Sequence, residues 1–124
     1  MPKTKVDRNL IYAKAIRQLG AQSQIDIAIE EMAELTKELL KQRRYGGNYF
    51  NILNELADVE VCCEQLRMIY SCSEALELRK DSVALRLEER LESGELNRYI
   101  DRHRDDEDLI QHVGYDDAQC GREK

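Results

Sequence analysis

The interior of this chain contains no proline, since the only proline among its 124 residues is Pro2. A proline inside a helix removes a backbone hydrogen bond and clashes with the preceding turn, so its absence leaves long helices open along the chain. The interior is also rich in Ala, Leu, Glu, Lys, Arg and Gln, which favour the helical state. The sequence therefore predicts an all-α fold.

Apolar residues recur three or four residues apart in three segments, which is the spacing of one helix face, and residues 71–73 are the expected cap of a fourth helix that ends at Ser93 and Gly94. The four predicted helices span residues 6–19, 24–44, 50–70 and 74–91. Gly20 is the expected end of the first helix, and Ser23 the expected N-cap of the second. The break at 45–48 is short, so the second and third helices should be antiparallel neighbours.

This length suits one hydrophobic core. We expect residues 1–100 to form one antiparallel four-helix bundle-like domain, with an extra turn at 95–100. Residues 101–124 are charged and lack periodicity, which is typical of a mobile tail.

The net charge is −6, from 25 acidic and 19 basic residues, and no long basic run is present. This balance argues against a nucleic-acid surface, and a small anionic substrate would need cations to mediate its contact. No apolar run approaches the roughly 20 residues that cross a bilayer. We expect neither nucleic acid nor membrane as a partner.

The cysteines have neither C-x-x-C spacing nor accompanying histidines, and the N-terminus lacks the apolar stretch of a signal peptide. They are Cys62, Cys63, Cys72 and Cys120. Reduced thiols in a cytoplasmic protein are the simple interpretation.

Two acid-x-x-acid motifs stand on the second and third predicted helices. Glu31 and Glu34 form one pair, and Glu55 and Asp58 form the other. Residues three apart project from the same helix face, so each pair presents two carboxylates side by side. Two antiparallel helices can then bring all four carboxylates together.

These acids border the predicted apolar stripes. On the third helix the stripe comprises Ile52, Leu56, Val59, Cys63, Leu66 and Tyr70. An unpaired charge at a buried boundary costs several kcal/mol per ion. Protonation, a basic residue or a bound cation could offset this cost. The third helix has no basic residue between Phe50 and Leu66, so a divalent cation is the better explanation. Oxygen-only ligands suit Mg²⁺, with Mn²⁺ as a substitute.

Other metal chemistries fit the sequence less well. Di-iron carboxylate bundles use Glu-x-x-His motifs, whereas both histidines, His103 and His112, lie in the tail. The cysteine and histidine spacing does not suit structural zinc. The sequence also contains no P-loop, dinucleotide fingerprint or nucleophile elbow.

The segments 20–40 and 51–60 together read Glu-Glu-x-x-Glu followed, after a loop, by Glu-x-x-Asp. With these motifs the chain resembles the MazG-like all-α nucleoside triphosphate pyrophosphohydrolases, over roughly residues 10–92. The resemblance implies Mg²⁺-dependent hydrolysis of a nucleoside or deoxynucleoside triphosphate to the monophosphate and pyrophosphate. It also implies that Glu31, Glu34, Glu55 and Asp58 are the metal ligands.

In that family, helical bundles assemble as dimers or tetramers, often with the substrate site completed across subunits. The wide spread of apolar residues on the third helix agrees with a partner surface. We therefore expect a homodimer or homotetramer.

Metal ions would bind the phosphates and lower the pKa of a bound water, and either Glu31 or Glu34 could take its proton. Gln24 and Asn51 stand seven residues before Glu31 and Asp58, on the carboxylate faces, and are candidates for substrate binding. Lys80 and Arg86 are candidates for phosphate contacts, although basic side chains on a helix are often simply solvated.

Two other hypotheses about the function remain open. A non-catalytic helical module could bind nucleotide or a protein partner with the same bundle and metal site. A plain helical bundle could also carry these acids as surface residues.

Overall fold

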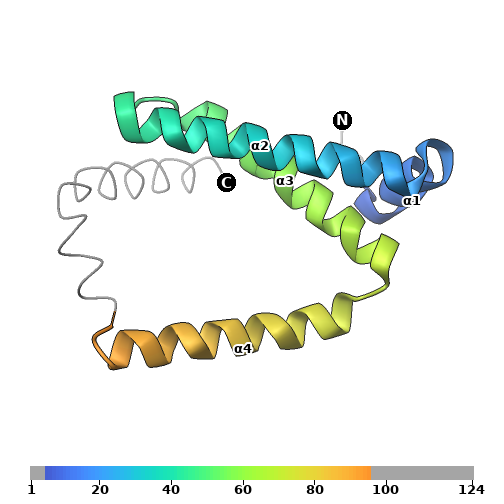
Figure 1. The fold of residues 1–124 in the computed structure, drawn as a ribbon. Coiled ribbons are helices and arrows are strands. Elements are labelled where there is room, and N and C mark those ends of the chain that lie inside the picture. Colours follow the sequence, from blue (N-terminus) through green and yellow to red (C-terminus); the bar gives the residue numbers. More distant parts are fainter. Residues whose placement is uncertain (1–4, 96–124) are drawn as a thin grey trace. The chain divides into compact units, whose positions relative to one another are not determined.

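The computed structural model describes residues 5–95 of the chain, and these residues form four α-helices without a β-strand. The helices are α1 (Arg8–Leu19), α2 (Ala21–Tyr45), α3 (Tyr49–Tyr70) and α4 (Ser73–Glu92) (Figure 1). The predicted all-α class is confirmed. The extra turn expected at 95–100 and the tail 101–124 lie outside the described residues, apart from Glu95.

The first helix boundary differs from the sequence prediction. Ser23 lies inside α2 and does not cap it, because α2 begins at Ala21 directly after Gly20. Gly20 has a positive φ of 89°, accepts a hydrogen bond from the Gln24 backbone N–H at 3.3 Å and donates its own N–H to Ile16 O at 2.9 Å. One glycine therefore ends α1 and opens α2, which leaves no loop for a serine cap.

The turn between α3 and α4 uses a serine where glycine is more usual. Ser71 has a φ of 49°, and its N–H bonds to Met68 O at 3.2 Å. The Cys72 N–H bonds to Arg67 O, also at 3.2 Å. These two bonds form a Schellman motif, which satisfies carbonyl groups at the end of α3 and stops the helix.

The chain divides into two compact units. Within residues 5–95, the first comprises the residues up to Leu40 together with Phe50–Ser73, and the second comprises Lys41–Tyr49 and the residues from Glu74 onward. In the first unit, α2 and α3 lie side by side and run antiparallel, as predicted (Figure 1). In the second unit, α4 buries none of its side chains.

The seam between α2 and α3 is polar. On α2 the buried residues are Gln24, Ala28 and Glu38, and on α3 they are Cys62 and Gln65. The prediction that the apolar stripe of α3 is buried was wrong for Leu56 and Tyr70, which are 43% and 63% exposed. The reason is that α2 packs on the carboxylate face of α3, about 100° around the helix from that apolar stripe.

Helix α1 is attached to α3 by one buried side chain. Tyr12 is 5% exposed, and its hydroxyl donates a hydrogen bond to the Glu64 carboxylate. Arg8 Nη2 lies 3.7 Å from Glu64 Oε1 in the same place. Asp7 caps α1, because its Oδ1 accepts from the Leu10 N–H at 3.1 Å.

No helix of the described residues is long and apolar enough to span a membrane.

Candidate metal centre

Three carboxylates from two helices converge at the middle of the α2–α3 seam. Glu31 belongs to α2, and Glu55 and Asp58 belong to α3. Each offers an oxygen, and these oxygens all lie within 4.8 Å of one another. Glu31 and Glu55 are half-buried whereas Asp58 is exposed, so the group is accessible from one side.

The local sequence explains this convergence. Glu55 and Asp58 are three residues apart and share one face of α3. Gln24 and Gln65 stand seven residues from Glu31 and Asp58 respectively, and they bond across the seam at 2.9 Å. Because the helices are antiparallel, the same seven-residue step on each places Glu31 opposite Asp58.

The electrostatic environment of Glu31 is unfavourable to its charge. Burial raises the pKa of Glu31 above its usual value, and the negative charges of Asp58 and Glu55 raise it further. A hydrogen bond with Glu55 and the charge of Glu30 act in the same direction. Among the described residues, no basic side chain forms an ion pair with any of the three carboxylates. A divalent cation would relieve this repulsion, so the donor set fits one.

Glu34, the fourth predicted ligand, does not belong to the group of three. It is exposed, and its Oε2 lies 3.9 Å from Lys37 Nζ on the next turn of α2. An exposed pair of this kind is worth less than about 1 kcal/mol, so it would not hold Glu34 away from another partner. Its role as a ligand or base stays a prediction.

The predicted substrate-binding residues occupy different surroundings. Gln24 is 4% exposed, and its Oε1 accepts the hydrogen bond from Gln65 Nε2. Asn51 is exposed on α3, one turn before Glu55. Lys80 and Arg86 are exposed on α4 in the second unit, where Lys80 Nζ lies 3.3 Å from Glu77 Oε1. Substrate contact by these four residues stays a prediction.

Cys62 lies next to the carboxylates on the seam and is 4% exposed. Burial raises the pKa of its thiol, and the nearby charges of Glu31, Cys63 and Asp58 raise it further. The thiol is therefore held in its neutral form, as expected of a small buried side chain.

The sequence reasoning missed two features. Gln65 was not singled out, although its step of seven residues from Asp58 repeats the step from Gln24 to Glu31. The Tyr12–Glu64 contact leaves no pattern in the sequence, because 52 residues separate the partners.

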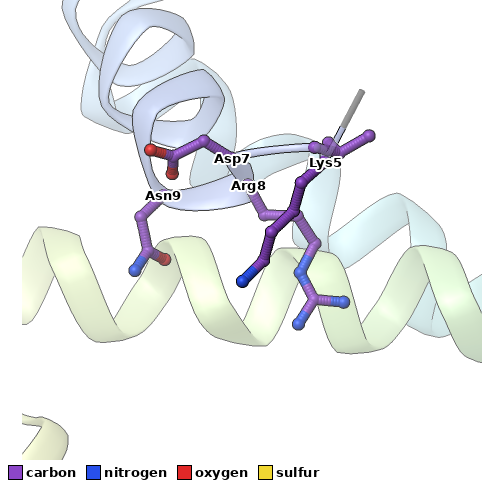
Figure 2. Close-up of a pocket in the computed structure, with 5 residues that line it drawn as sticks. Lys5, Asp7, Arg8 and Asn9 are labelled. Atoms are coloured by element: carbon purple, nitrogen blue, oxygen red, sulfur yellow. The ribbon is translucent and has the colours of Figure 1, made fainter. Parts of the chain in front are cut away.

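Residues Lys5 to Asn9 line an open depression of about 550 Å³, and Arg8 reaches from there toward α3 (Figure 2).

Comparisons of this chain with protein-family models, curated proteins and solved structures find no match.

Proposed function

We propose that this protein is a Mg²⁺-dependent hydrolase that cleaves a nucleoside or deoxynucleoside triphosphate to the monophosphate and pyrophosphate. The observation that carries the proposal is the approach of Glu31, Glu55 and Asp58 oxygens within 4.8 Å of one another. Both motifs of the sequence resemblance contribute to this group, and no basic side chain within the described residues neutralises it.

The three carboxylates would hold the ion through oxygen atoms, which Mg²⁺ prefers. When bound, Mg²⁺ would offset phosphate charge and activate water for attack on phosphorus. The exposed side of the group, at Asp58, is where a triphosphate would approach. An acidic protein of net charge −6 thereby gains a site for an anionic substrate.

Of the two candidates for the general base, the arrangement favours Glu34. The Glu31 oxygens belong to the group that would hold the ion. Glu34 lies one turn further along α2, outside that group and exposed to solvent. A carboxylate that does not itself bind the metal can accept the proton of an activated water beside it.

We also propose that the protein assembles as a homodimer or homotetramer through one face of the α2–α3 pair. The exposed apolar side chains on this face include Ile29, Met32, Leu39 and Leu56, at 61%, 43%, 47% and 43% exposure. On α2 the apolar side chains Ile29, Met32 and Leu39, and on α3 the apolar stripe, lie about 100° around the helix from the polar seam. On both helices this rotation runs in the direction in which residue numbers increase. In antiparallel helices this displacement puts both stripes on the same side, which yields one continuous apolar face. Homodimer interfaces bury faces of this kind.

The test is to incubate the protein with Mg²⁺ and a panel of nucleoside triphosphates and to identify the products. We expect monophosphate and pyrophosphate, and a loss of turnover by at least about a hundredfold in Glu55→Gln and Asp58→Asn. Glu60→Gln is the matched control, because Glu60 is an exposed acid of α3 outside the group. Tight binding of metal and nucleotide without product would instead support the non-catalytic module.

A further inference from the structure

A buried amide pair forms a polar contact between α2 and α3. Gln24 and Gln65 are 4% and 7% exposed, and Gln65 Nε2 donates to Gln24 Oε1 at 2.9 Å. The pair lies on the same seam as the carboxylates, two helical turns away along each helix. Ala28 and Cys62, both buried, fill the seam between the pair and the carboxylates.

This pair does not improve stability as an apolar pair would. Gln24 Nε2 is buried and has no hydrogen-bond partner among the described residues. A buried amide donor without a partner loses its hydration and gains nothing in return. Two leucines at these positions would bury a similar volume without that loss, so stability alone does not explain the glutamines.

The register of α2 against α3 is weakly determined by the rest of the seam. Ala28 and Cys62, the fully buried apolar side chains of the seam, are small, and many of the large apolar side chains of both helices are exposed. A slip by one turn moves a residue by about 5.4 Å along the helix, more than the spacing within the carboxylate group. Such a slip would separate Glu31 from Glu55 and Asp58. In helical pairs, one buried polar residue can fix register at a cost in stability.

We propose that Gln24 and Gln65 are a positioning pair that fixes the register of α2 against α3 and thereby holds Glu31 opposite Glu55 and Asp58. The effect on metal binding rests on the proposed function, whereas the effect on register does not. In this role Gln24 acts through the helix pair, and its buried amide needs no contact with substrate.

The test replaces both amides, in Q24L/Q65L, and uses Q22L as the matched control because Gln22 is an exposed amide of the same helix. We expect the double variant to melt at or above the wild-type temperature. Its ¹H–¹⁵N NMR spectrum should show doubled or broadened signals for α2 and α3, and its affinity for Mn²⁺ should fall at least about tenfold. Q22L should match the wild type in both respects. A double variant with one set of sharp signals would overturn the proposal.

A measurement on the wild-type protein keeps the proposal testable if the double variant does not fold. The side-chain amide protons of Gln24 and Gln65 should exchange with water far more slowly than those of Gln22. Equal exchange rates for the three side chains would contradict the positioning role. If wild-type protein does not bind Mn²⁺, the metal site fails, and the NMR and exchange results still decide the register proposal.

Discussion

Glu31 and Asp58 come from different helices, yet they offer oxygens within 4.8 Å of each other. No basic side chain of the described residues forms an ion pair with either carboxylate. The charge of Asp58 is one cause of the raised pKa of Glu31, after burial. Without a cation, the protein therefore keeps these two carboxylates close together against their electrostatic repulsion. This cost is the physical basis of the predictions for the site.

Metal binding should depend on pH through Glu31. Because the pKa of Glu31 is raised above the usual 4.5, an ion must displace a proton from Glu31 over a pH range above that value. We expect Mn²⁺ affinity to fall as the pH is lowered through the raised pKa, with release of a proton on binding. Titration calorimetry in two buffers of different ionisation enthalpy measures that proton. Binding without proton release throughout this range would contradict the prediction.

The metal-free protein should show the opposite trend in stability. A carboxyl group whose pKa is higher in the folded than in the unfolded state binds more protons when folded. Its stabilising contribution is therefore complete below the unfolded pKa and is lost as the pH rises through the folded pKa. Glu31→Gln should remove this loss and raise the melting temperature at neutral pH by on the order of 1–3 °C, a small gain because the group is partly solvated. A lower melting temperature would argue against charge repulsion at Glu31.

The helical segments could be predicted from the sequence because a proline-free stretch with helical apolar spacing favours a helix through its own local residues. The approach of Glu31 to Glu55 and Asp58 could also be predicted, since it follows from two local motifs and one short loop. The polar seam could not, because the largest apolar stripe is ordinarily the buried one. Here Leu56 remains exposed while Gln65 is buried, as expected if a second copy covers the apolar face.

The Tyr12 hydroxyl should contribute measurably to stability. Tyr12 is 5% exposed and donates to Glu64, so Tyr12→Phe leaves that carboxylate without its buried donor. We expect a loss of about 1–3 kcal/mol in the free energy of unfolding, measured by urea denaturation. Tyr45→Phe is the control, because Tyr45 is 81% exposed and should change little. Equal stability of the two variants would mean that the Tyr12–Glu64 bond does not hold α1 in place.

The two adjacent cysteines should react at different rates. Cys62 is buried with a raised thiol pKa, whereas Cys63 is exposed. Alkylation by iodoacetamide, followed by peptide mass spectrometry, should therefore modify Cys63 at least about tenfold faster, since the thiolate is the reactive form. Faster reaction at Cys62 would show that the seam opens in solution.

A charge placed on the apolar face should break the assembly. Leu56→Asp puts a carboxylate within that face, and burying it in an interface would cost several kcal/mol. Sedimentation should show a shift of the wild-type oligomer to monomer in this variant. Ala57→Asp adds the same charge at an exposed neighbour that points away from the face, and it should leave the oligomer intact. A wild-type monomer, or an intact Leu56→Asp oligomer, would contradict the assignment of this face.

The most direct test of the metal-dependent activity is ³¹P NMR of a nucleoside triphosphate panel incubated with the protein and Mg²⁺. We expect the pyrophosphate and monophosphate signals to grow together for at least one nucleotide. Neither signal should appear with a chelator or with Glu55→Gln. Growth of orthophosphate with nucleoside diphosphate, or unchanged triphosphate across the whole panel, would contradict the proposed function.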